Sequence, residues 1–395
     1  MSELSNGIQE LGDGEVIRMD SGETIFKLDS YAHNPIVKPQ DLGLTWREDN
    51  VLKTGAVFNG GAELFNDHII LLPRCHRNYK KSKFFDEKLG IERNCLENYA
   101  SEVWPLISSD GIHFTRFQNN VIRGDGTDHQ DFNYGIEDIR IIKCGQKHIL
   151  IGCGKTKRPF KETNADRIAI YSTDDFSNIS YHGIVESFDT RNAVLFPEPI
   201  NSRYYMLLRF NPNIHLDFLD AGMEQLLNPA KYKKEWEAIY KRRNQNILLE
   251  AGNYPHEKQK IGPGTQIINT KKGWLVIYHA VGEINEKICK HYGLSEKIGR
   301  GYSICAALLD RNDPKKILCR TRNPIYFPST PYELYGNDHY PIDVPAVVFP
   351  VGAIVIKNKL IIYAGAADKY TILLSCNLDN LVDYLCDYGS CSSYV

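Results

Sequence analysis

Residues 134–140, which read YGIEDIR, combine two adjacent acidic residues with an arginine. Glu137 and Asp138 stand side by side, with Arg140 two positions further on, at the start of an apolar run. In a β-strand, Asp138 and Arg140 share one face and Glu137 points to the other. A carboxylic acid in this setting can donate a proton to a leaving group. The guanidinium lowers the pKa of that acid unless burial opposes it, and a salt bridge at a strand entry is the alternative interpretation.

Two arginines bracket a second apolar segment. Arg191 lies in TRNAVLFPE (190–198), and Arg209 ends YYMLLR (204–209). Arginine within strands usually pairs with a carboxylate or binds an anion such as phosphate. One alternative is therefore pairing with Glu198 or another acid. The other predicts that both guanidinium groups face Asp138, with no acidic side chain neutralising them.

Other polar residues lie within or beside the remaining apolar segments. His279 ends one segment, Asp368 directly follows another, and Asn59 precedes a pair of glycines. Glycines permit a close approach of the backbone, whereas a lone histidine after an apolar strand is more often a core residue. The segment KIGPGT (260–265) lacks the spacing and the following helix of a phosphate loop, and no Cys or His spacing predicts a metal site.

One sequence pattern recurs five times: an apolar run, a short polar break and a second apolar run. This pattern predicts the structural elements that must position these residues. β-Branched and aromatic residues around such a break predict a β-hairpin. The five instances span residues 62–74, 139–154, 194–210, 265–281 and 353–368. Five hairpins spread over one chain favour an all-β, five-bladed β-propeller, in which loops from all blades converge on one site.

Shorter signals complete the predicted organisation. The segments SSDGIHF (108–114) and STDDF (172–176) predict equivalent turns. Residues 216–243 predict a helical insertion, with a start signal at the Asn-Pro pair 228–229. Its apolar face is expected to consist of Tyr232, Trp236, Ile239 and Tyr240. Residues 1–50 are expected to form an irregular lead-in, and residues 51–395 a single catalytic domain.

Composition narrows the class of protein. The chain has 395 residues, of which 42% are hydrophobic and 24% charged, and its formal net charge is −2. These values exclude a disordered chain and give no global attraction to nucleic acid or an anionic membrane. The apolar runs are too short to span a membrane, and the N-terminal residues lack an export signal. We therefore expect a cytoplasmic protein whose ten cysteines are reduced thiols.

Taken together, these segments resemble glycoside hydrolase family 130, the mannoside phosphorylases and β-mannosidases. The resemblance extends over residues 34–385, and its pieces occur in the family's order. The pieces are FNGGAELFNDHIILLPR, SSDGIHF, GIEDIR, NAVLFPE with YYMLLR, KIGPG, GWLVIYHAV, AALLDRNDPKKILCRTRNPI, VVFPVGA and IIYAGAAD. Members of this family are five-bladed propellers, which agrees with the number of predicted hairpins.

The resemblance implies roles for individual residues. Asp138 matches the family's single general acid, in a motif whose usual proline is replaced here by Ile139. Arg191 and Arg209 match its phosphate site, where the usual lysine has become arginine, the following acid is an amide and a histidine is lost. Further positive charge is expected on the loop after residues 139–154, from Lys155, Lys157 and Arg158. The implied sugar pocket consists of Asn59, Arg74, Arg140, His279 and Asp368.

Two chemistries make different physical demands on such a site. An inverting hydrolase needs a second carboxylate, about 6.5–9.5 Å from the acid, to activate water. A phosphorylase needs cations that hold phosphate, and the retained arginines favour inverting, reversible phosphorolysis of a β-mannoside to α-mannose 1-phosphate. A β-mannosidase with Glu137 or Glu198 as the base, and a non-catalytic carbohydrate-binding propeller, are the alternatives.

The expected partners follow from the favoured chemistry. They are a small carbohydrate and inorganic phosphate as co-substrate, without a metal, an organic cofactor, nucleic acid or a membrane. The sequence leaves open the glycosidic linkage, the acceptor sugar and the choice between a monomer and a homo-oligomer.

Overall fold

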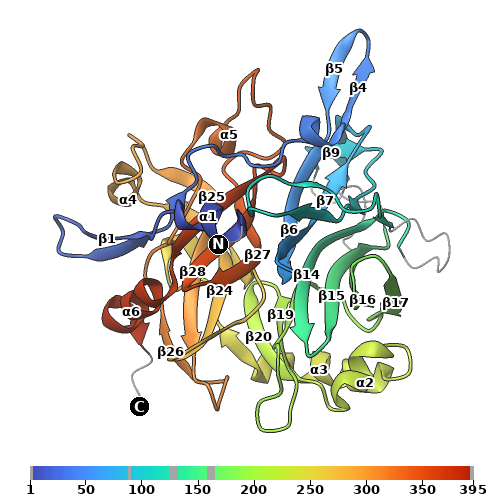
Figure 1. The fold of residues 1–395 in the computed structure, drawn as a ribbon, viewed down its shortest axis with the longest axis vertical. Helices are drawn as coiled ribbons and strands as arrows, with labels where there is room; N and C mark the ends of the chain where they lie inside the picture. The colour runs from blue at the N-terminus through green and yellow to red at the C-terminus, as the bar shows by residue number, and fades with distance from the viewer. Residues whose placement is uncertain (1–2, 88–89, 124–131, 158–164, 392–395) are drawn as a thin grey trace.

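The structure is a computed structural model that describes residues 3–87, 90–123, 132–157 and 165–391. Strands dominate it, and the fold is all-β (Figure 1). Three of the five larger sheets follow the chain in order, from a first strand outward.

The five larger sheets are named here sheet one to sheet five. Sheet one contains β6 (Ala56–Phe65), β7 (His68–His76), β10 (Glu102–Val103), β11 (Leu106–Ser108), β12 (Thr115–Arg116) and β13 (Ile122–Arg123). Sheet two contains β14 (Ile136–Cys144), β15 (Lys147–Lys155), β16 (Asp166–Thr173) and β17 (Ile179–Ile184). Sheet three contains β18 (Arg191–Leu195), β19 (Tyr205–Phe210), β20 (Asn213–Phe218) and β21 (Ile247–Leu249).

The C-terminal half of the chain supplies the other two large sheets. Sheet four contains β22 (Lys260–Pro263), β23 (Ile268–Thr270), β24 (Gly273–Ile284), β25 (Ile298–Leu309), β26 (Ile317–Arg320) and β30 (Ser390–Cys391). Sheet five contains β27 (Val348–Ile356), β28 (Lys359–Ala366), β29 (Tyr370–Asn377) and β3 (Asp29–Ser30). Three separate hairpins are β1 (Glu15–Arg18) with β2 (Thr24–Lys27), β4 (Thr45–Glu48) with β5 (Val51–Thr54), and β8 (Lys80–Asp86) with β9 (Ile91–Glu97).

Each of the five predicted hairpins lies in a different sheet, as expected. They are β6–β7, β14–β15, β18–β19, β23–β24 and β27–β28, all antiparallel. Their turns contain Asn66, Gly145, Ser202 and Asn358 in the left-handed conformation, which glycine and asparagine adopt more readily than most residues.

Contacts between the sheets form a closed circuit. β6 contacts β14, β14 contacts β18, and β18 contacts β22. β24 and β25 of sheet four contact β27, and β27 contacts β6 again. A separate hydrophobic cluster fills each of the five interfaces between successive sheets. The buried apolar side chains of the described residues are thus divided among five interfaces and do not form one central layer.

Residues 1–50 are more regular than the sequence predicts. They contain α1 (Glu3–Gln9), the β1–β2 hairpin and the 3-10 helix η1 (Pro39–Leu42). Their strand β3 pairs with β29, with Ser30 opposite Leu374. The sequence conceals this role because two residues of an edge strand carry no periodic signal.

The predicted helical insertion consists of α2 (Gly222–Leu227), α3 (Lys233–Arg242) and the 3-10 helix η2 (Arg243–Gln245). Its predicted start at residues 228–229 is wrong, since Asn228 follows the end of α2 and hydrogen-bonds back to Glu224. Proline is common after a helix end as well as at a helix start, so the signal was ambiguous. Trp236 and Ile239 are buried as predicted, whereas Tyr240 is 37% exposed.

The remaining helices are short apart from the last one. They are α4 (Glu286–Lys290), α5 (Pro331–Leu334), η3 (Pro255–Glu257) and α6 (Leu378–Tyr388). Among the described residues, no helix has the length and hydropathy needed to cross a membrane.

The two predicted turns are equivalent. The Ser108 and Thr173 hydroxyls each accept a hydrogen bond from the backbone N–H three residues further on. The first turn joins β11 to β12 in sheet one, and the second joins β16 to β17 in sheet two.

Candidate active site

The first strands of sheets one, two and three are each interrupted by a β-bulge at the level of the predicted site residues. The register shifts lie between Phe58 and Gly61, between Glu137 and Arg140, and between Arg191 and Val194. Asn59, Asp138 and Asn192 adopt positive φ angles of 54°, 54° and 62°. Asn and Asp tolerate this conformation, and a bulge redirects the side chains that follow it.

The bulge in β14 overturns the predicted alternation of its side chains. Glu137 and Asp138 were expected on opposite faces, but both accept hydrogen bonds from the Arg191 guanidinium. The alternative interpretation, a salt bridge at the strand entry, does not hold between the Asp138 and Arg140 side chains. Arg140 Nη1 donates instead to the backbone oxygen of Asp138 at 2.8 Å, and Arg140 Nε donates to the Gly264 oxygen at 2.9 Å.

Asp138 lies in a buried polar network drawn from three sheets. Asn59 Nδ2 donates to its Oδ1 at 3.0 Å, and Arg191 Nη2 donates to its Oδ2 at 3.0 Å. Arg74 Nε lies 3.5 Å from Oδ1. Burial raises the pKa of Asp138, but Arg74 and Arg191 more than offset it, so the pKa lies below its usual value. In this state Asp138 is a carboxylate at neutral pH.

Glu137 is surrounded by cations. It forms ion pairs with Arg74 and Arg191, and its Oε1 lies 3.2 Å from Lys155 Nζ. The Tyr99 hydroxyl donates to Oε2 at 2.7 Å. Burial alone would raise the pKa of Glu137, but these cations hold it well below its usual range. Glu137 therefore acts as a fixed negative charge that organises the basic side chains around Asp138.

A second group of basic side chains adjoins the first without a carboxylate partner. Within the described part of the chain, Arg209 forms no ion pair, and its Nε has no hydrogen-bond partner. Burial and the neighbouring Arg191 lower the pKa of Arg209 to about 10. Lys260 lies 5.2 Å from the ring centre of Tyr302, and burial together with Arg209 lowers the pKa of its amine.

His279 packs directly against this second group. It is fully buried, its ring centre lies 4.4 Å from that of Phe349, and neither ring nitrogen has a hydrogen-bond partner. Burial, followed by Arg209 and Lys260, lowers the pKa of His279 well below its usual value, so the ring is neutral. A Cβ at Gly262 would collide with His279 and Arg209, which explains why the close approach requires glycine.

The other predicted residues differ in how they relate to Asp138. Burial raises the pKa of Asp368 to about 6, Arg74 opposes this rise, and Asp138 adds to it. Lys157 is exposed, at the edge of the described residues, and Arg158 lies outside them. Glu198 is exposed beyond the far end of β18 and accepts a hydrogen bond from Asn269 at 3.4 Å.

The prediction for the two arginines is half right. For Arg209 the part of the prediction on pairing holds, because it forms no ion pair with a described carboxylate, although the charge of Asp166 opposes the lowering of its pKa. Arg191 contradicts it, because Glu137 and Asp138 both pair with Arg191 and Asp166 lies 3.8 Å away. Sequence distance concealed these pairs, since Arg191 lies more than fifty residues from either acid in the β14 bulge.

A comparison of the whole chain with protein-family models shows to which family it belongs. The model of glycoside hydrolase family 130, described as beta-1,4-mannooligosaccharide phosphorylase, matches residues 31–387. The chain belongs to this family. A beta-1,2-mannobiose phosphorylase from Thermoanaerobacter sp. (strain X514) is 27% identical over 349 residues, which cover 88% of this chain and 96% of the relative.

Solved structures of family 130 proteins have a similar fold. The beta-1,2-mannobiose phosphorylase of Listeria innocua, in complex with beta-1,2-mannobiose, superposes with a TM-score of 0.64 at 22% identity, covering 91% of this chain and 99% of that one. A second structure has a TM-score of 0.64 at 18% identity, with coverage of 89% and 94%. Its description states that this family of mannoside phosphorylases contains hydrolases that target beta-1,2 mannosidic linkages in Candida mannan.

Several charged neighbours of Asp138, the predicted general acid, could not be identified from the sequence of this family 130 protein. Asp166 pairs with Lys155, which lies at the end of β15 rather than on a loop. Lys260 and Tyr302 adjoin Arg209. Lys260 is the first residue of the KIGPG segment, which is one of the pieces that resemble family 130. Because this segment does not match a phosphate loop, its lysine was given no role in the prediction.

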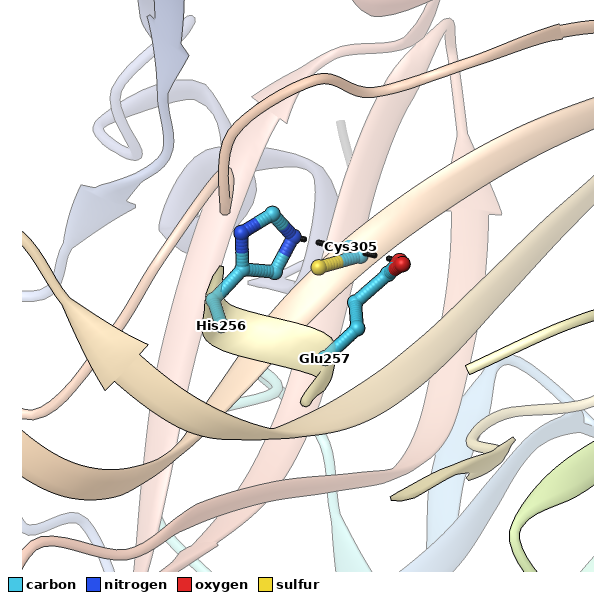
Figure 2. A group of neighbouring side chains, drawn as sticks. All are labelled: His256, Glu257 and Cys305. Atoms are coloured by element: carbon cyan, nitrogen blue, oxygen red, sulfur yellow. Dashed lines mark ion pairs between the residues drawn. The ribbon is translucent and has the colours of Figure 1, made fainter. Parts of the chain in front are cut away.

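One group of side chains in this family 130 chain has the composition of a metal site. Among the described residues, His256, Glu257 and Cys305 bring their ligand atoms within 4.8 Å of one another (Figure 2). Both carboxylate oxygens of Glu257 accept hydrogen bonds from Arg320, and Tyr278 donates to Oε1 at 2.9 Å. A metal ion would have to displace that guanidinium, so these residues fit a buried ion-pair network better than a metal centre.

Proposed function

We propose that this protein catalyses reversible, inverting phosphorolysis of a β-mannoside and releases α-mannose 1-phosphate. Family membership and the mannoside phosphorylases among its relatives support this reaction class. The observation that carries the proposal is the uncompensated positive charge of Arg209 and Lys260 beside Asp138 and Arg191. Both side chains are partly buried, and partly buried cations without a carboxylate partner are costly unless an anion joins them. Phosphate supplies that anion.

In this proposal, Asp138 donates a proton to the leaving oxygen, directly or through a sugar hydroxyl. Arg191 and Arg209 hold phosphate, Lys260 adds to the same positive field, and Lys157 contributes from the rim. Phosphate near Arg191 offsets the charge that keeps Asp138 ionised, so its binding raises the pKa of the acid. The sugar pocket is formed by Asn59, Arg74, Arg140, His279 and Asp368.

Hydrolysis of the same bond is the second candidate. Glu137 is a poor base for it, because its carboxylate is already neutralised by cations and its pKa is strongly lowered. Glu198 is exposed at the other end of β18. One observation favours hydrolysis: Asp368, with a pKa of about 6, is suited to accept a proton from water.

The proposal extends to the architecture. We propose that the five sheets are the blades of one propeller, formed by residues 51–395 together with β3, which the lead-in of residues 1–50 contributes to sheet five. The closed circuit of sheet contacts and the five separate interface clusters support this arrangement. Asn59, Asp138 and Arg191 lie on the first strands of their sheets, and Arg74 and Arg209 lie near the ends of the second strands. The inner strands are where the blades of a propeller converge.

The deciding experiment measures the phosphate requirement. The protein is incubated with β-1,2-mannobiose and with β-1,4-mannobiose, each with and without inorganic phosphate, and mannose and mannose 1-phosphate are quantified. We expect mannose 1-phosphate only when phosphate is present, from one of the two linkages. Release of two mannose molecules per substrate at the same rate without phosphate would establish the hydrolase instead. No turnover of either sugar, with binding retained, would favour a non-catalytic module.

A further inference from the structure

The last described strand of the chain carries a thiol that faces a second thiol across sheet four. β30 runs antiparallel to β26, with Cys391 directly opposite Cys319. The two sulfur atoms lie 3.5 Å apart, and both thiols are free. Opposed residues of an antiparallel pair have Cα atoms about 4.5–5.5 Å apart, which is within the range that a disulfide spans.

The two thiols differ in their access to solvent. Cys391 is exposed, whereas Cys319 is 5% exposed. A cavity of about 330 Å³ adjoins Cys391 and is also lined by Arg320, Ser390 and Glu250. Burial, followed by the neighbouring Cys391 and Cys386 thiols, raises the pKa of Cys319. A small oxidant arriving from solvent therefore meets Cys391 first, with Cys319 in place to react second.

We propose that Cys319 and Cys391 form a disulfide when the protein meets a hydroperoxide. The Cys391 thiolate attacks an oxygen of hydrogen peroxide and the O–O bond breaks. The departing hydroxide takes up the proton that the thiol released, so a sulfenic acid and one water form. The Cys319 sulfur then attacks the Cys391 sulfur, and the sulfenic oxygen leaves as a second water with the remaining proton. Two thiols are oxidised to one disulfide while one hydrogen peroxide is reduced to two waters.

The bridge would fasten the C-terminal segment to the body of the protein. α6 follows β29 of sheet five and contacts β25 and β26 of sheet four, and β30 then joins the edge of sheet four. Residues 378–391 thus connect the two sheets, as the lower left of Figure 1 shows. A disulfide to Cys319 closes a loop of about 70 residues, and such cross-links stabilise mainly by restricting the unfolded chain.

The test uses the full chain, reduced and then treated with hydrogen peroxide. We expect the number of free thiols, measured after denaturation, to fall by two of the ten, and non-reducing peptide mapping to link Cys319 to Cys391. The oxidised protein should show a Tm higher by about 2–6 °C and slower proteolysis of its C-terminal segment. Dithiothreitol should reverse all three changes.

Matched variants separate this pair from other thiols. Cys391→Ser changes an exposed side chain, so it should fold normally, and it should abolish the linked peptide and the Tm shift. Cys386→Ser and Cys144→Ser, both partly buried, should leave them intact. The proposal fails if mapping finds a Cys319–Cys386 bridge or linked dimers through Cys391. It also fails if peroxide oxidises Cys144 at a dose that leaves Cys319 and Cys391 reduced.

Discussion

The two halves of the candidate site differ in whether their positively charged side chains are paired with carboxylates. Around the β14 bulge, Arg74, Lys155 and Arg191 are compensated by Glu137, Asp138 and Asp166. On the side of sheets three and four, Arg209 and Lys260 have no described carboxylate partner. The compensated half maintains its geometry without a ligand. The uncompensated half gains most when an anion arrives, which is the behaviour expected of a site for phosphate.

The largest effect is expected at the acid that the compensated half holds in place. Asp138→Asn removes the transferable proton but keeps a similar shape, so turnover of the mannoside should fall by about 10²–10⁴-fold. The variant should stay folded but unfold at a lower denaturant midpoint than wild type, because Arg74 and Arg191 lose a carboxylate partner. Near-normal turnover in steady-state assays would remove Asp138 from the mechanism.

Next in size is the effect of removing the anion that organises the compensated half. Glu137→Gln leaves three buried cations with less negative charge, so the free energy of unfolding should fall by about 3–5 kcal/mol. Urea denaturation measures this loss. Glu102→Gln is the control, because its carboxylate pairs with Arg77 at a more exposed position and should cost about 0–1 kcal/mol. Equal losses in both variants would contradict the contrast between the halves.

Arg209 and Arg191 test the contrast directly. Arg209→Met should raise the KM for phosphate by about 10–100-fold, because a charge-assisted hydrogen bond of about 1.5–3 kcal/mol is lost. It should not lower stability, since no described carboxylate loses a partner. Arg191→Met should raise the same KM and also destabilise the protein, because Glu137 and Asp138 lose a cation. Arg203→Met, on the outer face over Phe218, should change neither phosphate KM nor turnover.

A pH effect of moderate size is expected at Asp368. Its folded-state pKa of about 6 exceeds its ordinary 3.8, so protonation favours the folded state. The stability that it contributes is present below about pH 4 and lost as pH rises through about 6. Asp368→Asn should therefore be more stable than wild type by about 1–3 kcal/mol at pH 7, with no advantage at pH 4. Asp67→Asn, in an exposed turn, is the control and should show no such pH dependence.

The smallest effect is expected at the rim. Lys157→Ala should raise the KM for phosphate by less than about threefold, because solvent screens an exposed lysine. If Lys157→Ala raised the KM for phosphate more than Arg209→Met does, the phosphate site would have to lie closer to the loop after β15 than we propose. Measuring both variants at low and at physiological ionic strength would separate direct contact from screening.

The recurrence of hairpins was enough to predict five sheets and to bring Asn59, Asp138 and Arg191 toward one place. Strand alternation was not enough to predict how their side chains point, because the bulges in β6, β14 and β18 break the two-residue period where the site lies. The pairing of Arg191 with Glu137 could not be read from the sequence, since no local pattern encodes which distant charges meet. The roles assigned to the site residues remain predictions for the experiments above.

The pairing of β3 with β29 has a consequence for how the chain is made. β3 is synthesised long before its partner residues around Leu374, because the strands from β4 to β28 lie between them along the chain. Sheet five, and with it the contact from β27 to β6, can be completed only after those strands have been translated. We expect nascent chains that stop after β26 to remain open and to depend on chaperones, and we expect the emergence of β27, β28 and β29 to close the circuit.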